Sequence, residues 1–183
     1  MVGSLGRMSS ASEILECAVE VLKRDEAFTL DAVAREAGLT KPGVVHHFAT
    51  KDRLVVAVAE YIVDQWEADL RTRARDDDTP QGRLRSYVDY ALTSDFDASD
   101  LALLVDGRLR TRLRDLWLDR LDAWLGWAID GPTEYRAALR AARLLADGAW
   151  MNSALDIPTV HDDERAALHR IALDLINEES AEL

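Results

Sequence analysis

The sequence has a single cysteine, Cys17, among 183 residues, so an internal disulfide framework is excluded. Only four prolines and nine glycines interrupt the chain, which leaves room for long helices. No apolar run approaches the roughly 20 residues that a membrane-spanning helix needs. The first ten residues include one arginine but no apolar stretch of the kind found in a signal peptide. We therefore expect a cytoplasmic protein that has no membrane partner.

The net charge of −12 argues at first against a nucleic-acid partner, but the charges are unevenly distributed. Residues 1–53 contain seven Lys and Arg against eight Asp and Glu, whereas residues 54–183 contain 15 against 26. The acidic excess therefore belongs to the C-terminal part. Because the N-terminal part is not basic either, DNA binding would have to depend on a few well-placed contacts.

Apolar residues recur with helical spacing throughout, and no strand-like alternation is present. The pattern predicts an all-α fold of about nine helices. An N-terminal helix-turn-helix domain over residues 9–55 would be joined through a long fourth helix to a C-terminal domain over residues 56–183. The expected helices cover residues 10–23, two short helices within 29–48, then 50–73, 79–93, 99–105, 110–129, 133–155 and 162–178. Cys17 lies in the apolar stripe of the first helix, which favours a structural role over a reactive thiol.

The segment from Thr29 to Phe48 contains two short helical patterns separated by a turn. Thr29 and Thr40 are both placed to cap a helix, and Gly38 can adopt the left-handed backbone that ends the first one. Pro42 falls in the first turn of the second helix, where its missing N–H is not needed. This pattern predicts a helix-turn-helix whose second helix enters the DNA major groove. The alternative is a helical hairpin that only packs.

Residues 33–54, VAREAGLTKPGVVHHFATKDRL, closely resemble the helix-turn-helix of the tetracycline-repressor (TetR) family. The resemblance depends on Ala34, residues 37–40, Gly43, residues 47–48, Lys51 and Leu54. It implies a homodimeric transcriptional repressor whose second domain binds a small molecule. The chain departs from the family pattern at Val45, where an aromatic residue is usual, and at Pro42, where glycine is more usual.

The residues expected at the DNA divide into positioning and reading contacts. Thr29, Thr40 and Lys51 are candidates for phosphate contacts. Lys41 could reach a guanine edge, Val44 or Val45 a thymine methyl group, and Gly43 would allow close backbone approach. The full expected set is Thr29, Thr40, Lys41, Pro42, Gly43, Val44, Val45, His46, His47 and Lys51.

The resemblance implies that His47 turns partly inward beside Phe48, where a structural role and a phosphate contact are both open. His46 is expected to be the more exposed of the two adjacent histidines. Neighbouring histidines lack the spacing of a metal site, and no cysteine or third histidine lies nearby in the sequence. We expect no metal and no cofactor.

Four of the five tryptophans lie in the C-terminal helices, and Trp66 lies far along the fourth. Packing alone could explain any one of them, but the group predicts an aromatic ligand pocket with a few polar groups. The expected pocket residues are Trp66, Tyr87, Tyr90, Asp106, Trp117, Trp124, Trp127, Trp150 and Asn152. The expected effector is a small apolar or aromatic molecule.

Small residues along 137–149, together with the apolar stripe of the last helix, predict a four-helix dimer interface. Packing within one chain is the competing explanation. The expected interface residues are Ala138, Ala141, Ala142, Leu145, Ala149, Leu168, Ile171 and Leu175.

The sequence thus favours a repressor that binds a near-palindromic double-stranded DNA operator as a homodimer and is released by its effector. One alternative is a constitutive DNA binder whose second domain only dimerises. Another is a helical-bundle enzyme, although neither a Glu-x-x-His pair nor a nucleophile motif is present.

Overall fold

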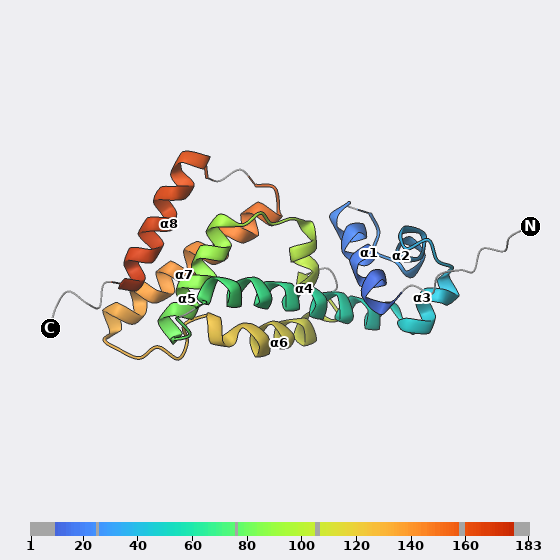
Figure 1. Cartoon of the computed structure of the whole chain (residues 1–183), viewed down its shortest axis with the longest axis horizontal. Coiled ribbons are helices and arrows are strands. Elements are labelled where there is room, and N and C mark those ends of the chain that lie inside the picture. Colours follow the sequence, from blue (N-terminus) through green and yellow to red (C-terminus); the bar gives the residue numbers. More distant parts are fainter. Residues whose placement is uncertain (1–9, 25, 76, 105–106, 158–159, 178–183) are drawn as a thin grey trace, which may run out of the picture. The chain divides into compact units, whose positions relative to one another are not determined.

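The computed structural model describes residues 10–24, 26–75, 77–104, 107–157 and 160–177. Within these ranges the chain is all-helical, with eight α-helices and two 3-10 helices (Figure 1). The elements are α1 (Ala11–Lys23), α2 (Leu30–Glu36), α3 (Lys41–His47), α4 (Lys51–Ala74), α5 (Pro80–Thr93), η1 (Ala98–Leu104), α6 (Arg110–Leu121), η2 (Asp122–Trp124), α7 (Thr133–Ala154) and α8 (Asp162–Asn177). The chain divides into two compact units, the first ending at Tyr61 and the second starting at Ile62, and both of these residues belong to α4. None of the described helices is long and apolar enough to cross a bilayer.

The helices of the first unit begin where the sequence places capping side chains. Ser10 and Glu13 form a reciprocal capping box at the start of α1. The Thr29 hydroxyl accepts a hydrogen bond from the Ala32 amide at the start of α2, and Thr40 accepts one from Gly43 at the start of α3. Each such cap contributes about 1 kcal/mol.

The turn between α2 and α3 is fixed by glycine at its centre. Gly38 has a φ of +64° and donates to the Arg35 carbonyl, while Leu39 donates to the Ala34 carbonyl. This pair of bonds is a Schellman motif, which satisfies the carbonyls that the end of α2 would otherwise leave unpaired. Beneath the turn, Val33 and Val44 are fully buried, so the two helices share one small core.

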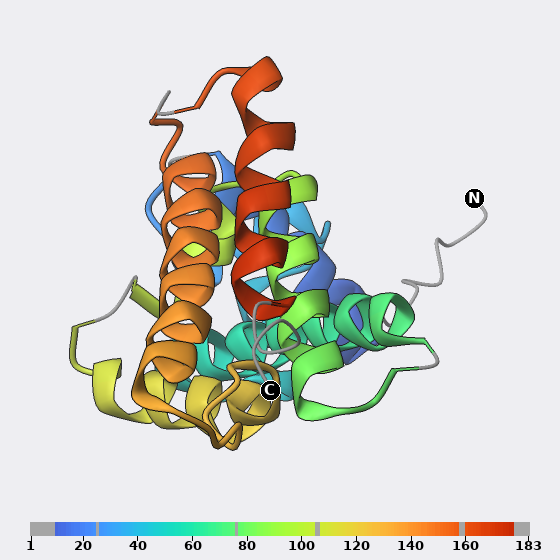
Figure 2. The ribbon, with the colours of Figure 1, turned by 90° about the vertical axis from the view of Figure 1, so that its left-hand side faces the viewer.

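The second unit is a helical bundle in which α7 packs against both α5 and α8, and α5 also packs against α8. Figure 2 shows these three helices side by side. Their shared core includes Leu84 of α5, Leu139 and Ala146 of α7, and Ile176 of α8, all almost fully buried.

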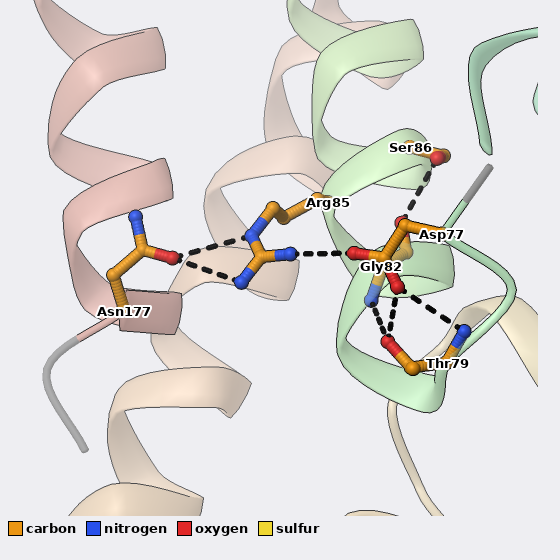
Figure 3. Close-up of polar contacts among 6 residues, drawn as sticks. All are labelled: Asp77, Thr79, Gly82, Arg85, Ser86 and Asn177. Carbon is orange, nitrogen blue, oxygen red and sulfur yellow. Dashed lines mark hydrogen bonds and ion pairs between the residues drawn. The ribbon is translucent and has the colours of Figure 1, made fainter. Parts of the chain in front are cut away.

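The start of α5 is held by a polar network around the Thr79 cap (Figure 3). The Thr79 hydroxyl accepts from the Gly82 amide and donates to the Asp77 carboxylate. Arg85, one turn further along, joins that carboxylate to the side-chain oxygen of Asn177 at the end of α8. The Thr79–Pro80 start predicted from the sequence is therefore confirmed, and the network links it to the last helix.

Two predicted helices differ in the structure: one is shorter than expected, and the other is a 3-10 helix. The helix expected over residues 110–129 stops at Leu121 and continues only as the short η2. A regular helix cannot continue through residue 126, because Gly126 has a φ of +67° and lies so close to α5 that an added Cβ would be 2.9 Å from a Leu84 methyl group. The helix expected over 99–105 is the 3-10 helix η1, with the Asp97 carboxylate accepting from the Ser99 amide at its start.

Candidate functional site

Helix α3 presents one exposed face and one buried face. Lys41, Pro42, Val45 and His46 are exposed at positions i, i+1, i+4 and i+5, which share one side of a helix. Val44 has no exposed surface and belongs to the core, so the expectation that it could contact DNA was wrong. Among the two valines, only Val45 can meet a base.

Lys41 is not an unpaired cation. Its ammonium lies 2.8 Å from the Asp31 carboxylate in the first turn of α2, and both side chains are exposed. An exposed ion pair of this kind is worth little in stability, so the lysine can exchange its partner readily. Thr29, Thr40 and the half-buried Lys51 lie at the starts of α2, α3 and α4, where backbone N–H groups also point outward.

The two histidines at the end of α3 are both exposed. The His46 and His47 rings meet edge to face at 5.4 Å, and the His47 ring lies 6.4 Å from that of Phe48. His47 is thus exposed but lies beside Phe48, and Phe48 itself enters the core. No group of three or more potential metal ligands occurs among the described residues.

Aromatic rings converge on Trp66 in the second unit. The Trp66 ring lies 4.9 Å from Trp117, 5.2 Å from Tyr90 and Trp150, and 5.3 Å from Phe96, measured between centroids. Its indole N–H donates to the Asp100 carboxylate at 2.9 Å. Four predicted pocket residues are thus brought together, but in direct contact with one another, as in a packed core.

A hydrogen-bonded chain continues from this aromatic cluster. The Trp150 indole donates to the Tyr87 hydroxyl at 3.2 Å, and that hydroxyl donates to Asp147 at 2.6 Å. Arg143 lies 3.3 Å from the other oxygen of the same carboxylate. Burial, followed by the charge of Asp147, raises the pKa of Tyr87 well above its ordinary value, so the tyrosine keeps its proton.

The other predicted pocket residues lie apart from this cluster. Trp127 is 46% exposed, with the guanidinium groups of Arg140 and Arg143 at 4.2 and 4.5 Å from its ring. Trp124 is buried beside a different surface hollow, and Asn152 borders a small hollow of about 190 Å³ near the end of α7. Asp106 lies outside the described residues.

Sequence reasoning missed three members of the cluster and its polar chain: Phe96, Asp100 and Asp147. A signal was available for Asp147, because it precedes Trp150 by three positions on one helix and therefore shares its face. Phe96 and Asp100 lie in and just after the loop that follows α5, where no periodicity indicates which side chains turn inward.

The predicted interface residues lie on different faces of α7 and α8. Ala142 is fully buried within its own chain and is not available to a partner, so its placement in the interface was wrong. Ile171 is 51% exposed, and Leu168 and Leu175 are half-buried. Among the large apolar residues of α7, Leu144 is the most exposed, at 67%, and it was not expected in the interface. The remaining predicted positions, Ala138, Ala141, Leu145 and Ala149, are half-buried or exposed.

Known protein families match residues in both units of the chain. The family described as "Bacterial regulatory proteins, tetR family" matches residues 14–58, and "Tetracyclin repressor-like, C-terminal domain" matches residues 81–177. The HTH-type transcriptional regulator BetI of Burkholderia mallei (strain NCTC 10229) is 32% identical, with 82% of each chain covered. BetI of Paraburkholderia phytofirmans (strain DSM 17436 / LMG 22146 / PsJN) is also 32% identical, with 81% of each chain covered.

A solved structure of the multidrug binding protein EbrR, in complex with imidazole, has the same fold. The TM-score is 0.58 at 22% identity, and the similarity covers 93% of this chain and 97% of that one. The matched families and the curated relatives are transcriptional regulators rather than enzymes. This chain therefore belongs to the tetR family of bacterial transcriptional regulators and binds DNA through its helix-turn-helix.

Proposed function

We propose that this regulator is a repressor that binds a near-palindromic operator as a homodimer and leaves it when a small apolar or aromatic molecule binds. It would act in the cytoplasm, where the DNA is. The division at residues 55 and 56 into a DNA-binding and a regulatory domain is part of this proposal.

The observation that carries the proposal is an apolar surface on the last two helices. Eight large apolar side chains of the described chain are notably exposed, and five of them lie within residues 144–171. On α7, Leu144, Met151 and the C-cap residue Leu155 recur at spacings of seven and four, so they form one stripe. Ile157, just after the end of α7, and Ile171 on α8 are exposed as well. A stripe of this kind marks a protein interface, and two copies would bury it as a four-helix contact.

Sedimentation velocity tests the dimer. Leu144→Asp should convert the dimer to monomers, because a partner would have to bury an unpaired carboxylate. Leu118→Asp is the matched control, since Leu118 is also exposed but lies on α6. A wild-type monomer at every concentration, or equal effects of both variants, would contradict the proposed interface.

The exposed face of α3 supports a separation of the operator contacts into phosphate contacts and base contacts. Thr29, Thr40 and Lys51 would bind phosphates, while Lys41, Val45 and His46 would contact base edges. Two recognition helices, one from each subunit, must lie about one DNA turn apart, roughly 34–36 Å, or a multiple of it. The operator should therefore consist of two related half-sites.

The aromatic cluster around Trp66 is the proposed effector site. An effector would have to displace at least one ring, and the displacement would move α4, which carries Trp66 and begins at Lys51 just after the recognition helix. The spacing of the two recognition helices would change as a result. The ligand can shift this equilibrium only by its difference in affinity for the two states. The multidrug binding protein EbrR, which has a similar fold, supports the proposal that this domain binds a ligand.

The close packing of the rings favours the alternative, a constitutive DNA binder whose bundle only dimerises. Titration of the operator complex with indole and with 1-naphthol distinguishes the two proposals, with isothermal titration calorimetry of the free protein reporting saturation. A compound that saturates the protein and releases DNA supports the ligand-responsive repressor. Saturation without release contradicts the proposed release mechanism, and the absence of binding by both compounds supports the constitutive binder.

A further inference from the structure

A surface hollow of about 390 Å³ in the second unit is lined mainly by charged side chains. It lies where the end of α4, the start of α5 and the end of α6 meet. Six charged residues surround it: Glu67, Arg71, Arg75, Asp78, Arg83 and Arg120. None of them belongs to the exposed face of α3, to the aromatic cluster around Trp66 or to the apolar stripe of α7.

Positive charge predominates in the hollow, although the whole chain carries −12. The residues that line the hollow carry four guanidinium groups and two carboxylates. Arg120 binds Glu67 and also Asp64, which lies 2.6 Å away, and Arg71 lies 3.3 Å from Glu67. Glu67 is buried, so its pairing with Arg120 is part of the framework of the bundle.

Arg75 has no carboxylate partner among the described residues. Its Nε donates to the Thr72 carbonyl at 3.2 Å, which leaves the two terminal nitrogens of the guanidinium for another acceptor. Arg75 is also one of two described non-glycine residues with positive φ, at +37°, where a helix end usually has glycine. An unfavourable backbone conformation is thus retained at the residue that brings this side chain to the hollow.

Arg83 is held by a partner that can be exchanged. It binds Asp78 through two hydrogen bonds of 2.7 and 2.9 Å, but the Asp78 side chain is 75% exposed. An incoming anion could take over both N–H donors while Asp78 turns into water. The Arg83 guanidinium also lies 5.9 Å from the Trp124 ring centroid, which helps to fix the orientation of its donors.

Guanidinium groups bind carboxylates and phosphates through two parallel N–H donors. Arg75 and Arg83 together can hold two such groups of one ligand, with Arg71 at the rim. We propose that this hollow binds a small organic polyanion that carries two or more carboxylate or phosphate groups. The proposal does not depend on the aromatic effector site or on operator release.

Isothermal titration of the full chain with citrate and with pyrophosphate tests the proposal, with sodium chloride keeping the ionic strength constant. At least one of the two probes should bind saturably at one site per chain. Arg75→Ala with Arg83→Ala should weaken that binding at least about tenfold, because each arginine supplies charge-assisted hydrogen bonds. Asp78→Asn should strengthen it, because a competing carboxylate is removed.

The matched control is Arg136→Ala with Arg170→Ala, which removes the same charge from exposed positions on α7 and α8. This double variant should bind the probe as the wild type does. Arg75→Ala alone, which breaks no ion pair with the described residues, should give a smaller loss and serves if the double variant does not fold. Absence of saturable binding by both probes, or equal losses in the hollow and control variants, would overturn the proposal.

Discussion

Removal of the Tyr87 hydroxyl should destabilise the second unit without changing its shape. The hydroxyl donates to Asp147 at 2.6 Å and accepts from Trp150 at 3.2 Å, and the tyrosine is fully buried. A hydrogen bond to a charged group contributes about 1.5–3 kcal/mol, and leaving a buried N–H without a partner adds to that cost. Because Arg143 still faces Asp147, we expect Tyr87→Phe to cost about 2–3 kcal/mol in total.

Urea unfolding followed by tryptophan fluorescence measures this loss. Tyr90→Phe is the matched control, because Tyr90 is also buried but its hydroxyl forms no hydrogen bond with the described residues. That control should change the free energy of unfolding by less than about 0.5 kcal/mol. If both substitutions cost the same, the stabilisation assigned to the hydroxyl network is wrong.

The same tyrosine gives the pH dependence of stability a definite sign. Burial raises the pKa of Tyr87, and also that of Tyr90, above the value of an unfolded tyrosine. Above about pH 10 the unfolded chain loses these protons while the folded chain keeps them, so stability falls as pH rises. Unfolding measured between pH 8 and 11 should show this decline, and it should be shallower in Tyr87→Phe. An unchanged slope in that variant would mean that Tyr87 does not hold its proton as inferred.

Three further predictions concern the start of α5 and the DNA-binding face. Gly82→Ala should cost about 1–3 kcal/mol, because the added Cβ would overlap the Asp77 carbonyl; an unchanged unfolding midpoint would contradict this. In salt-dependent binding assays, Lys51→Ala should weaken binding to every DNA and reduce the salt slope, whereas Lys41→Ala should change the preference among sites. Identical effects of both on all sequences would refute the division into positioning and reading contacts. Replacing operator thymines by deoxyuridine one at a time should weaken binding about fourfold at the base facing Val45, and Val45→Ala should abolish that sensitivity.

The sequence predicts the starts of helices better than their ends. Thr29 and Thr40 cap helices as expected, and Thr79 caps α5 where the helix expected over 79–93 begins, because a capping hydrogen bond spans only three residues and depends on local chemistry. The end of a helix depends more on distant contacts: the chain cannot continue as a helix through Gly126, which has a φ of +67° and approaches α5 about 40 residues earlier in the sequence, and periodicity does not indicate this contact.

At the functional sites the sequence identifies residue types but not their surroundings. Neighbouring Val44 and Val45 are chemically identical, and only the packing of α2 against α3 decides that one is core and the other exposed. The sequence shows how many tryptophans the chain has. The exposure of Trp127 and the packing of rings around Trp66 depend on tertiary structure, which the sequence pattern does not indicate. The arginine-lined hollow could not be found from spacing, because its members come from three helices.

The ring cluster around Trp66 has a spectroscopic consequence. Three indoles, those of Trp66, Trp117 and Trp150, lie within 5.8 Å of one another in fixed orientations. Aromatic rings held rigidly by tertiary packing give near-ultraviolet circular dichroism, which is lost when that packing loosens. The protein therefore contains its own optical reporter, and an effector that parts these rings would change the spectrum without any added label.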